Sequence, residues 1–220
     1  MDFQKVKAVL FDLDGTLLDT VQDIGTCIND VLCRYGFPPR KMEEFPAFLG
    51  HGRLDAIKKA VPEGTSEEMC LQISSEYAVH YRENCDRRTA YYPGVCEFLD
   101  ALQKSGYVLG VITNKTQETA DRIMSKYFPD YSFELLWGNN GKRPLKPSLE
   151  SAELACKTLG LKPEEILFVG DGDTDMQFAS RAGFLACGVT WGYRSRAVLE
   201  EYGAHILVDS YDELEKLFFA

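Results

Sequence analysis

Short apolar runs alternate with amphipathic stretches along most of the chain. Residues 6–12 form an apolar run that closes on aspartate and glycine, a pattern typical of a buried strand. Further strands are predicted at 107–113, 133–137, 166–170, 184–190 and 205–208, and helices at 93–106, 117–127, 148–160, 174–182, 195–202 and 211–219. Strands that alternate with helices favour a parallel sheet with right-handed crossovers. The predicted fold class is therefore α/β, with a Rossmann-like parallel sheet core.

A different pattern fills residues 20–83, where only helices are expected. Apolar side chains recur at helical spacing from Val21 to Tyr35, shorter helical patterns lie near 42–49 and 53–61, and residues 65–68 (TSEE) fit a capping box for a further helix. The predicted domains are a catalytic core made of 1–19 and 84–220 and an inserted all-helical cap made of 20–83.

The composition and net charge of the chain argue against some classes of function. The chain has 220 residues, is 45% hydrophobic and carries a net charge of −10, from 24 basic and 34 acidic residues. Nucleic acid and anionic lipid reward positive charge, so neither is an expected partner. The seven cysteines are odd in number and include no C-x-x-C pair, which argues against a disulfide framework and a zinc knuckle. The first residues lack the apolar core of a signal peptide, and no apolar run is long enough for a membrane span. We expect a cytoplasmic protein, monomeric or homodimeric.

The first candidate for chemistry is the pair Asp12 and Asp14, which close the first strand. Residues two apart in a strand face the same side, and Gly15 permits a sharp exit. Two close carboxylates repel unless a cation lies between them, and Mg²⁺ accepts one or two carboxylates together with phosphate oxygens. The alternative is a plain Asp-Gly turn.

Two further candidates follow later strands. Thr113, Asn114 and Lys115 stand at the end of the strand at 107–113, where a hydroxyl and backbone N–H groups can hold an oxyanion. Taken alone, Thr113 and Asn114 suit a helix-start turn better. Lys146 lies between Pro144 and Pro147 and can balance phosphoryl oxygens, although a solvated lysine is the simpler reading in isolation.

The fourth candidate is the acidic segment 170–175 (GDGDTD), which follows the strand at 166–170. An EF-hand loop that began at Asp171 would need glycine and glutamate where Met176 and Ala182 stand, so a calcium loop is rejected. Acidic ends on two strands instead suit one shared metal ion. Asp173 has no assigned role beyond a helix N-cap.

Taken together, these clusters resemble the haloacid dehalogenase superfamily of aspartate-nucleophile phosphotransferases. The matching segments, in the family's order, are 12–20 (DLDGTLLDT), 111–115 (VITNK), Lys146-Pro147 and 169–175 (VGDGDTD), and the resemblance covers essentially the whole chain. The insertion resembles the family's small helical cap. Segments 92–95 (YPGV), 113–115 (TNK) and 191–194 (WGYR) resemble phosphoglycolate phosphatases in particular.

The resemblance implies a role for each matching residue. Asp12 is the implied nucleophile that forms an aspartyl-phosphate, and Asp14 the implied general acid and base. Mg²⁺ is the implied cofactor, held by Asp12, Asp14 through its backbone carbonyl, Asp171 and Asp175, the last of which either supports the metal or orients Lys146. The implied phosphate ligands are Thr113, Lys146 and the backbone N–H of Asn114.

The resemblance also implies a function. The expected enzyme is a Mg²⁺-dependent phosphatase of a small phosphorylated metabolite, with 2-phosphoglycolate the best single substrate. Arg53 or His51, in a glycine-flanked cap loop, is expected to meet the rest of the substrate, unless this loop is a plain interhelical turn. The alternatives are a nucleotide or pyrophosphate hydrolase, a sugar-phosphate mutase, and a catalytically silent binding module.

Overall fold

The centre of the protein is a parallel sheet of six strands. The computed structural model describes residues 3–219; residues 1, 2 and 220, at the outer ends of the predicted core segments, lie outside it. The strand order is β5-β4-β1-β6-β7-β8, with every pairing parallel. This confirms the predicted α/β class. The strands are β1 (Ala8–Phe11), β4 (Val108–Thr116), β5 (Phe133–Asn139), β6 (Ile166–Gly170), β7 (Leu185–Val189) and β8 (Ile206–Val208).

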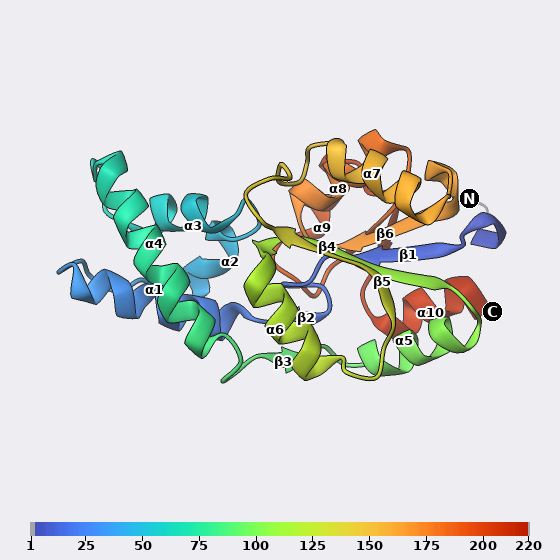
Figure 1. Ribbon diagram of the computed structural model, residues 1–220, viewed down its shortest axis with the longest axis horizontal. Coiled ribbons are helices and arrows are strands. Elements are labelled where there is room, and N and C mark those ends of the chain that lie inside the picture. Colours follow the sequence, from blue (N-terminus) through green and yellow to red (C-terminus); the bar gives the residue numbers. More distant parts are fainter. Residues whose placement is uncertain (1–2, 220) are drawn as a thin grey trace.

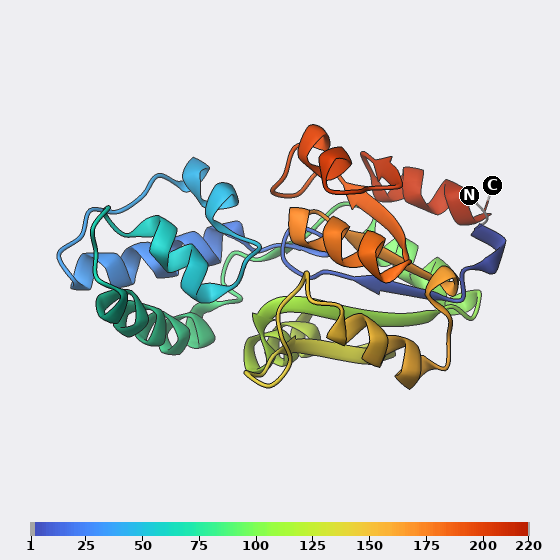
Figure 2. The same ribbon diagram turned by 90° about the horizontal axis from the view of Figure 1, so that it is seen from above.

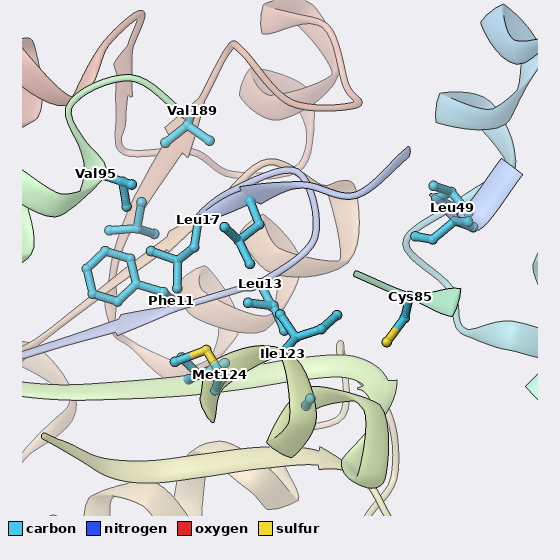
Figure 3. Close-up of a cluster of buried hydrophobic side chains, with 14 of the residues drawn as sticks. Phe11, Leu13, Leu17, Leu49, Cys85, Val95, Ile123, Met124 and Val189 are labelled. Carbon is cyan, nitrogen blue, oxygen red and sulfur yellow. The ribbon is translucent and has the colours of Figure 1, made fainter. Parts of the chain in front are cut away.

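Helices cover both faces of this sheet (Figures 1 and 2). Val9 and Phe11 of β1 face one layer, and Ala8 and Leu10 face the other, because side chains alternate along a strand. Figure 3 shows part of the first layer, where Phe11 lies near Val95 and Met124. That layer contains α5 (Val95–Lys104), α6 (Gln117–Tyr127) and α10 (Tyr211–Phe219); the other contains α7 (Glu150–Leu159), α8 (Asp173–Ala182) and α9 (Arg196–Glu201).

The segment between the first strand and the rest of the sheet is helical, as its sequence predicts. It lies beyond the carboxyl end of β1, at the opposite end of the molecule from the described ends of the chain (Figures 1 and 2). Its apolar faces, with Ile28 and Ile73 fully buried, share one cluster. That this insertion is a separate domain stays a prediction. Its helices are α1 (Val21–Arg34), α2 (Phe45–Phe48), α3 (Arg53–Ala60) and α4 (Glu67–Asn84).

The described residues also form three short 3-10 helices, at Phe3–Lys5, Met42–Glu44 and Pro163–Glu165. Among residues 3–219, no helix is long and apolar enough to cross a bilayer.

The two chain segments that join the insertion to the sheet pair with each other. Strands β2 (Leu18–Asp19) and β3 (Ala90–Tyr91) form an antiparallel ribbon. The sequence did not predict this ribbon, because two-residue strands carry no readable period. Next to it, buried Asp23 in the first turn of α1 accepts hydrogen bonds from the backbone N–H groups of Arg88 and Thr89, at 2.8–3.0 Å, and from the Thr89 hydroxyl at 2.9 Å. The entering and leaving segments are thus held together at one carboxylate.

Several helix starts differ from the prediction in their first residue or in their cap. Ser66, not Thr65, caps α4 by accepting from the Met69 N–H, because the Thr65 hydroxyl donates to the Pro62 carbonyl instead. The helix predicted from residue 148 is α7, which begins at Glu150 without a side-chain cap.

The Asp23 network yields a stability prediction. Asp23→Ala removes the acceptor of the Arg88 and Thr89 N–H groups, while the Thr89 hydroxyl can still donate to the Cys85 carbonyl. Loss of charge-assisted bonds of this kind costs about 2–4 kcal/mol. Denaturant unfolding should show this loss. Asp30→Ala, which removes a half-exposed carboxylate from the same helix, is the control and should cost less than about 1 kcal/mol. Equal losses for the two variants would contradict the role given to Asp23.

Candidate active site

A cavity of about 90 Å³ lies where the carboxyl ends of the strands meet the helical insertion. Parallel sheets place ligands at this edge. One wall of the cavity comes from the sheet and its loops, and includes Asp12, Asp14, Thr113, Asn114, Lys115, Asp171 and Asp175. The opposite wall comes from the insertion, and includes Ile24, Leu49, Gly50, Gly52, Arg53, Ala56, Tyr77, Ala78 and Tyr81. The structure therefore brings three of the four predicted motifs to one place.

The fourth motif, Lys146, does not line this cavity but contacts two of the carboxylates that do. The Lys146 side chain is 2% exposed, and its ammonium lies 3.0 Å from Asp12 Oδ1 and 2.7 Å from Asp175 Oδ1. It also donates to the carbonyl of Ile112 at 2.7 Å. A lysine this deeply buried is a paired lysine, so the solvated alternative is wrong for Lys146.

The same carboxylates still have unused capacity as ligands. Asp12 Oδ1 and Asp175 Oδ1 are buried, and both lie at ion-pair distance from the Lys146 ammonium. Neither oxygen accepts a hydrogen bond from the described residues. One oxygen each from Asp12, Asp171 and Asp175 lies within 4.8 Å of the others. Hard oxygen donors in a tight group are the ligands that Mg²⁺ selects, so these residues fit the metal that the sequence predicts.

Crowding of the carboxylates changes their acidity. Burial, with smaller contributions from Asp175 and Asp14, raises the pKa of Asp12 to about 6, against the opposing effect of Lys146. Burial, then Asp175 and Asp12, raises the pKa of Asp171 well above its ordinary value. Without a cation beyond Lys146, the site therefore favours carboxyl groups that hold protons.

Asp171 is fixed by close packing. Its carboxylate accepts from the Thr16 hydroxyl at 3.0 Å and from the Tyr193 backbone N–H at 2.7 Å. A Cβ atom at Gly15 or Gly192 would come within 2.2 or 2.3 Å of this side chain, and Gly15 also has a positive φ of 83°. Only glycine fits at these two positions, so the loops after β1 and β7 close tightly around Asp171.

Asp14 lies outside the three-carboxylate group. It accepts from the Thr20 hydroxyl at 2.7 Å and from the Lys115 ammonium at 2.7 and 3.0 Å. Lys115 also donates to the Tyr81 hydroxyl of α4 at 2.7 Å. Sequence reasoning gave Lys115 and Tyr81 no role. The signal for Lys115 was its place directly after Thr113 and Asn114, whereas Tyr81 reads as one more apolar position of its helix.

Thr113 and Asn114 both line the cavity, but their side chains are used differently. The Thr113 hydroxyl accepts from the Lys115 backbone N–H at 3.3 Å. The Asn114 amide donates to the Gly50 carbonyl of the insertion at 2.8 Å and accepts from the Lys146 N–H at 2.8 Å. Asn114 thus joins the lysine loop to the cap loop through its side chain, which leaves its backbone N–H as the group proposed for phosphate.

Asp173 is not the N-cap of α8, because the helix begins at Asp173 itself and Gly172 takes the cap position. Its carboxylate pairs with Arg194 at 2.9 Å and with His51 at 3.0 Å. Arg194 also donates to the carbonyls of Pro46 and Leu49, both at 2.6 Å. These contacts, which we call the Asp173 clasp, hold residues 46–51, the end of α2 and the loop that follows it, against the sheet. His51 belongs to the clasp and does not line the cavity, whereas Arg53 does.

Comparison with known proteins agrees with this geometry. The family model described as haloacid dehalogenase-like hydrolase matches residues 9–189. A phosphoglycolate phosphatase from Haemophilus influenzae is 29% identical, over 94% of this chain and 96% of its own length. An N-acetylmuramic acid 6-phosphate phosphatase from Pseudomonas aeruginosa is 31% identical, over 97% and 95%.

Solved structures give the same result. The crystal structure of a predicted phosphoglycolate phosphatase from Haemophilus somnus superposes with a TM-score of 0.88 at 28% identity, covering 97% of this chain and 98% of that one. The chain therefore belongs to the haloacid dehalogenase-like hydrolases, as a phosphatase of that family.

Proposed function

We propose that the protein is a Mg²⁺-dependent phosphatase that works through an aspartyl-phosphate on Asp12, with 2-phosphoglycolate as its substrate. The observation that carries this proposal is the group of Asp12, Asp171 and Asp175 at the wall of a cavity, with Asp12 and Asp175 paired to buried Lys146. Such a group suits a transferred phosphoryl, whose charge is spread over its equatorial oxygens. The choice of 2-phosphoglycolate is supported by the relative from Haemophilus influenzae.

In the first step, an Asp12 oxygen attacks phosphorus while the bond from phosphorus to the ester oxygen breaks. Asp14, an anion beside Lys115 in the substrate-free protein, takes up a proton from solvent as substrate binds and gives that proton to the leaving alkoxide. In the second, Asp14 removes a proton from water, which attacks the aspartyl-phosphate and restores Asp12. Asp14 is positioned for both steps by Thr20 and Lys115. When bound, Mg²⁺ supplies positive charge to the phosphoryl oxygens, held by Asp12, Asp171, Asp175 and the Asp14 carbonyl.

The remaining donors of the sheet edge hold the phosphoryl group. Thr113 and Asn114 line the cavity, and the Thr113 hydroxyl and the Asn114 backbone N–H are the groups assigned to the phosphoryl oxygens. Lys146, paired with Asp12, adds its positive charge. Because Lys146 also contacts Asp175, we assign Asp175 both a place at the metal and the orientation of Lys146.

The insertion of 20–83 acts as the cap of the core made of 1–19 and 84–220. Its loop at 46–51, held by the Asp173 clasp, covers the cavity, and Arg53 on α3 faces the substrate. A covered cavity excludes bulk water during phosphoryl transfer. Cytoplasmic location is supported by the seven unpaired cysteines, which suit a reducing compartment. A monomeric or homodimeric state stays a prediction.

A second candidate is a phosphatase of a sugar phosphate, which the Pseudomonas aeruginosa relative favours. A nucleotide or pyrophosphate hydrolase and a sugar-phosphate mutase need the same carboxylates, and no contact in the described residues favours either. A silent binding module would not need buried carboxylates with unused ligand capacity, which argues against it.

Asp12→Asn should abolish turnover, because an amide cannot act as the nucleophile. We expect phosphate release from 2-phosphoglycolate in Mg²⁺ to fall at least about 10³-fold. The assay should include sugar phosphates, nucleoside monophosphates and pyrophosphate, and chelation of the metal should stop the wild-type reaction reversibly. A variant with normal turnover would refute the nucleophile assignment, and a sugar phosphate hydrolysed best would favour the second candidate.

The raised pKa of Asp12 predicts that the same variant stabilises the metal-free protein. Between pH 3.8 and about 6 the folded carboxyl holds a proton that the unfolded one has lost, so folding stability falls as pH rises through this window. The full penalty is about 3 kcal/mol. Asp12→Asn removes it, and Asp175 still pairs with Lys146.

Unfolding in chelator should therefore show a gain for Asp12→Asn that is about 2 kcal/mol larger at pH 7.5 than at pH 4.5. The exposed Asp130→Asn is the control and should show no such pH dependence. A gain that shrank as pH rose would contradict the crowding described for the site.

Arg53→Ala and His51→Ala form a matched pair of cap variants. Arg53 lines the cavity, so its removal should lower kcat/KM for 2-phosphoglycolate about tenfold or more, mostly through KM. His51 contacts Asp173 instead, and its removal should change KM less than about threefold. Steady-state kinetics measure both; unchanged KM and kcat for Arg53→Ala would remove it from the substrate site.

A further inference from the structure

The Lys115 ammonium is a buried positive charge beside Asp14, where the leaving group of the substrate would lie. Its side chain is 4% exposed, and it is bound to Asp14 and to the Tyr81 hydroxyl, with the ammonium 4.7 Å from the centre of the Tyr81 ring. A buried ammonium is costly unless an anion balances it. Asp14 supplies that anion in the substrate-free protein.

The position of Lys115 follows from the role proposed for Asp14. An ester oxygen that takes a proton from Asp14 must come within roughly 2.6–3.2 Å of its carboxyl group. The Lys115 ammonium is 2.7 and 3.0 Å from the two oxygens of that carboxyl group. A substituent one or two bonds from the ester oxygen is therefore within reach of Lys115.

The surroundings favour an anionic substituent at this point. The insertion contributes an aliphatic and aromatic surface there, including Ile24, Ala56 and Tyr77, which cannot balance a charge. Of the other cations nearby, Lys146 pairs with Asp12 and Asp175, and Arg194 pairs with Asp173. Arg53 of the cap also lines the cavity, but only Lys115 contacts Asp14. Asp14 keeps its hydrogen bond from Thr20 if Lys115 turns to the substrate.

We infer that Lys115 is a specificity-determining residue that binds a carboxylate on the carbon next to the phosphoester, so that the substrate class is the small 2-phosphocarboxylates. This inference rests on the proposed phosphatase function and deepens it. The Tyr81 hydroxyl accepts a hydrogen bond from the same ammonium and so helps to fix its position from the cap side. Selection thus involves the core and the cap together.

The test compares 2-phosphoglycolate with 2-hydroxyethyl phosphate, which has the same length and an alcohol in place of the carboxylate. Lys115→Gln keeps a donor for Asp14 and removes the charge. Loss of its contact with Asp14 should lower kcat/KM for both esters, and the fall should be at least about 20-fold larger for 2-phosphoglycolate, because only its carboxylate also loses a counter-charge. The inhibition constant of glycolate, the product, should rise in parallel. Lys115→Met is the second variant, and thermal unfolding establishes that each variant is folded.

Thr20→Val is the matched control, because it removes the other donor to Asp14 without changing charge. It should slow both esters by the same factor. If Lys115→Gln also slowed both esters equally, Lys115 would only position Asp14 and the inference would be overturned. It would also be overturned if the wild-type enzyme showed no preference for 2-phosphoglycolate, or hydrolysed an aryl phosphate and neither small ester. If no phosphoester at all were hydrolysed, the proposed function itself would fail.

Discussion

The ammonium of Lys146, held between Asp12 and Asp175, is the contact on which the site depends. Parallel pairing of β1 with β6 brings Asp12 and the acidic segment after Gly170 to one edge of the sheet, where their charges repel. One buried cation offsets only part of that repulsion, since burial and the neighbouring carboxylates still raise the pKa of Asp12 and Asp171. The site therefore lacks positive charge, which a divalent cation would supply, alone or together with a bound phosphoryl group. The site is thus less stable empty than it would be when filled, which is a common cost of a preorganised active site.

The loops around the site are shaped by the need to bring backbone close to these carboxylates. Gly15 and Gly192 leave no room for a side chain beside Asp171, and the Thr16 carbonyl between them accepts from the side chains of Trp191 and Tyr211. The loop after β1 is therefore fixed by contacts from the C-terminal part of the chain, far away in sequence. Rigid placement of Asp12 and Asp14 follows, because both belong to that loop.

Most of the architecture was predictable from sequence because its signals are local. Apolar runs located the six strands, and helix 117–127 was predicted at its observed bounds. The four candidate motifs were predictable because each follows a strand, and parallel strands end at one edge. The β2–β3 ribbon and the Asp173 clasp were not predictable, since each depends on contacts between segments distant in the chain. The role of Lys115 was missed for the same reason: its place after Thr113 and Asn114 puts it at the strand end, but its partner Asp14 lies 101 residues away.

The segment 171–175 shows how one short stretch serves both the chemistry and the cap. Asp171 and Asp175 belong to the carboxylate group, while Asp173 pairs with Arg194 and His51. The same turn therefore positions metal ligands and holds the loop at 46–51 over them. Asn114 adds a second link, because its amide contacts both that loop and the backbone of Lys146. Any movement of the cap loop must break hydrogen bonds made by residues that adjoin the catalytic groups. Closure of the cap and order at the strand ends are consequently coupled through direct contacts, and substrate that stabilises one of them stabilises the other.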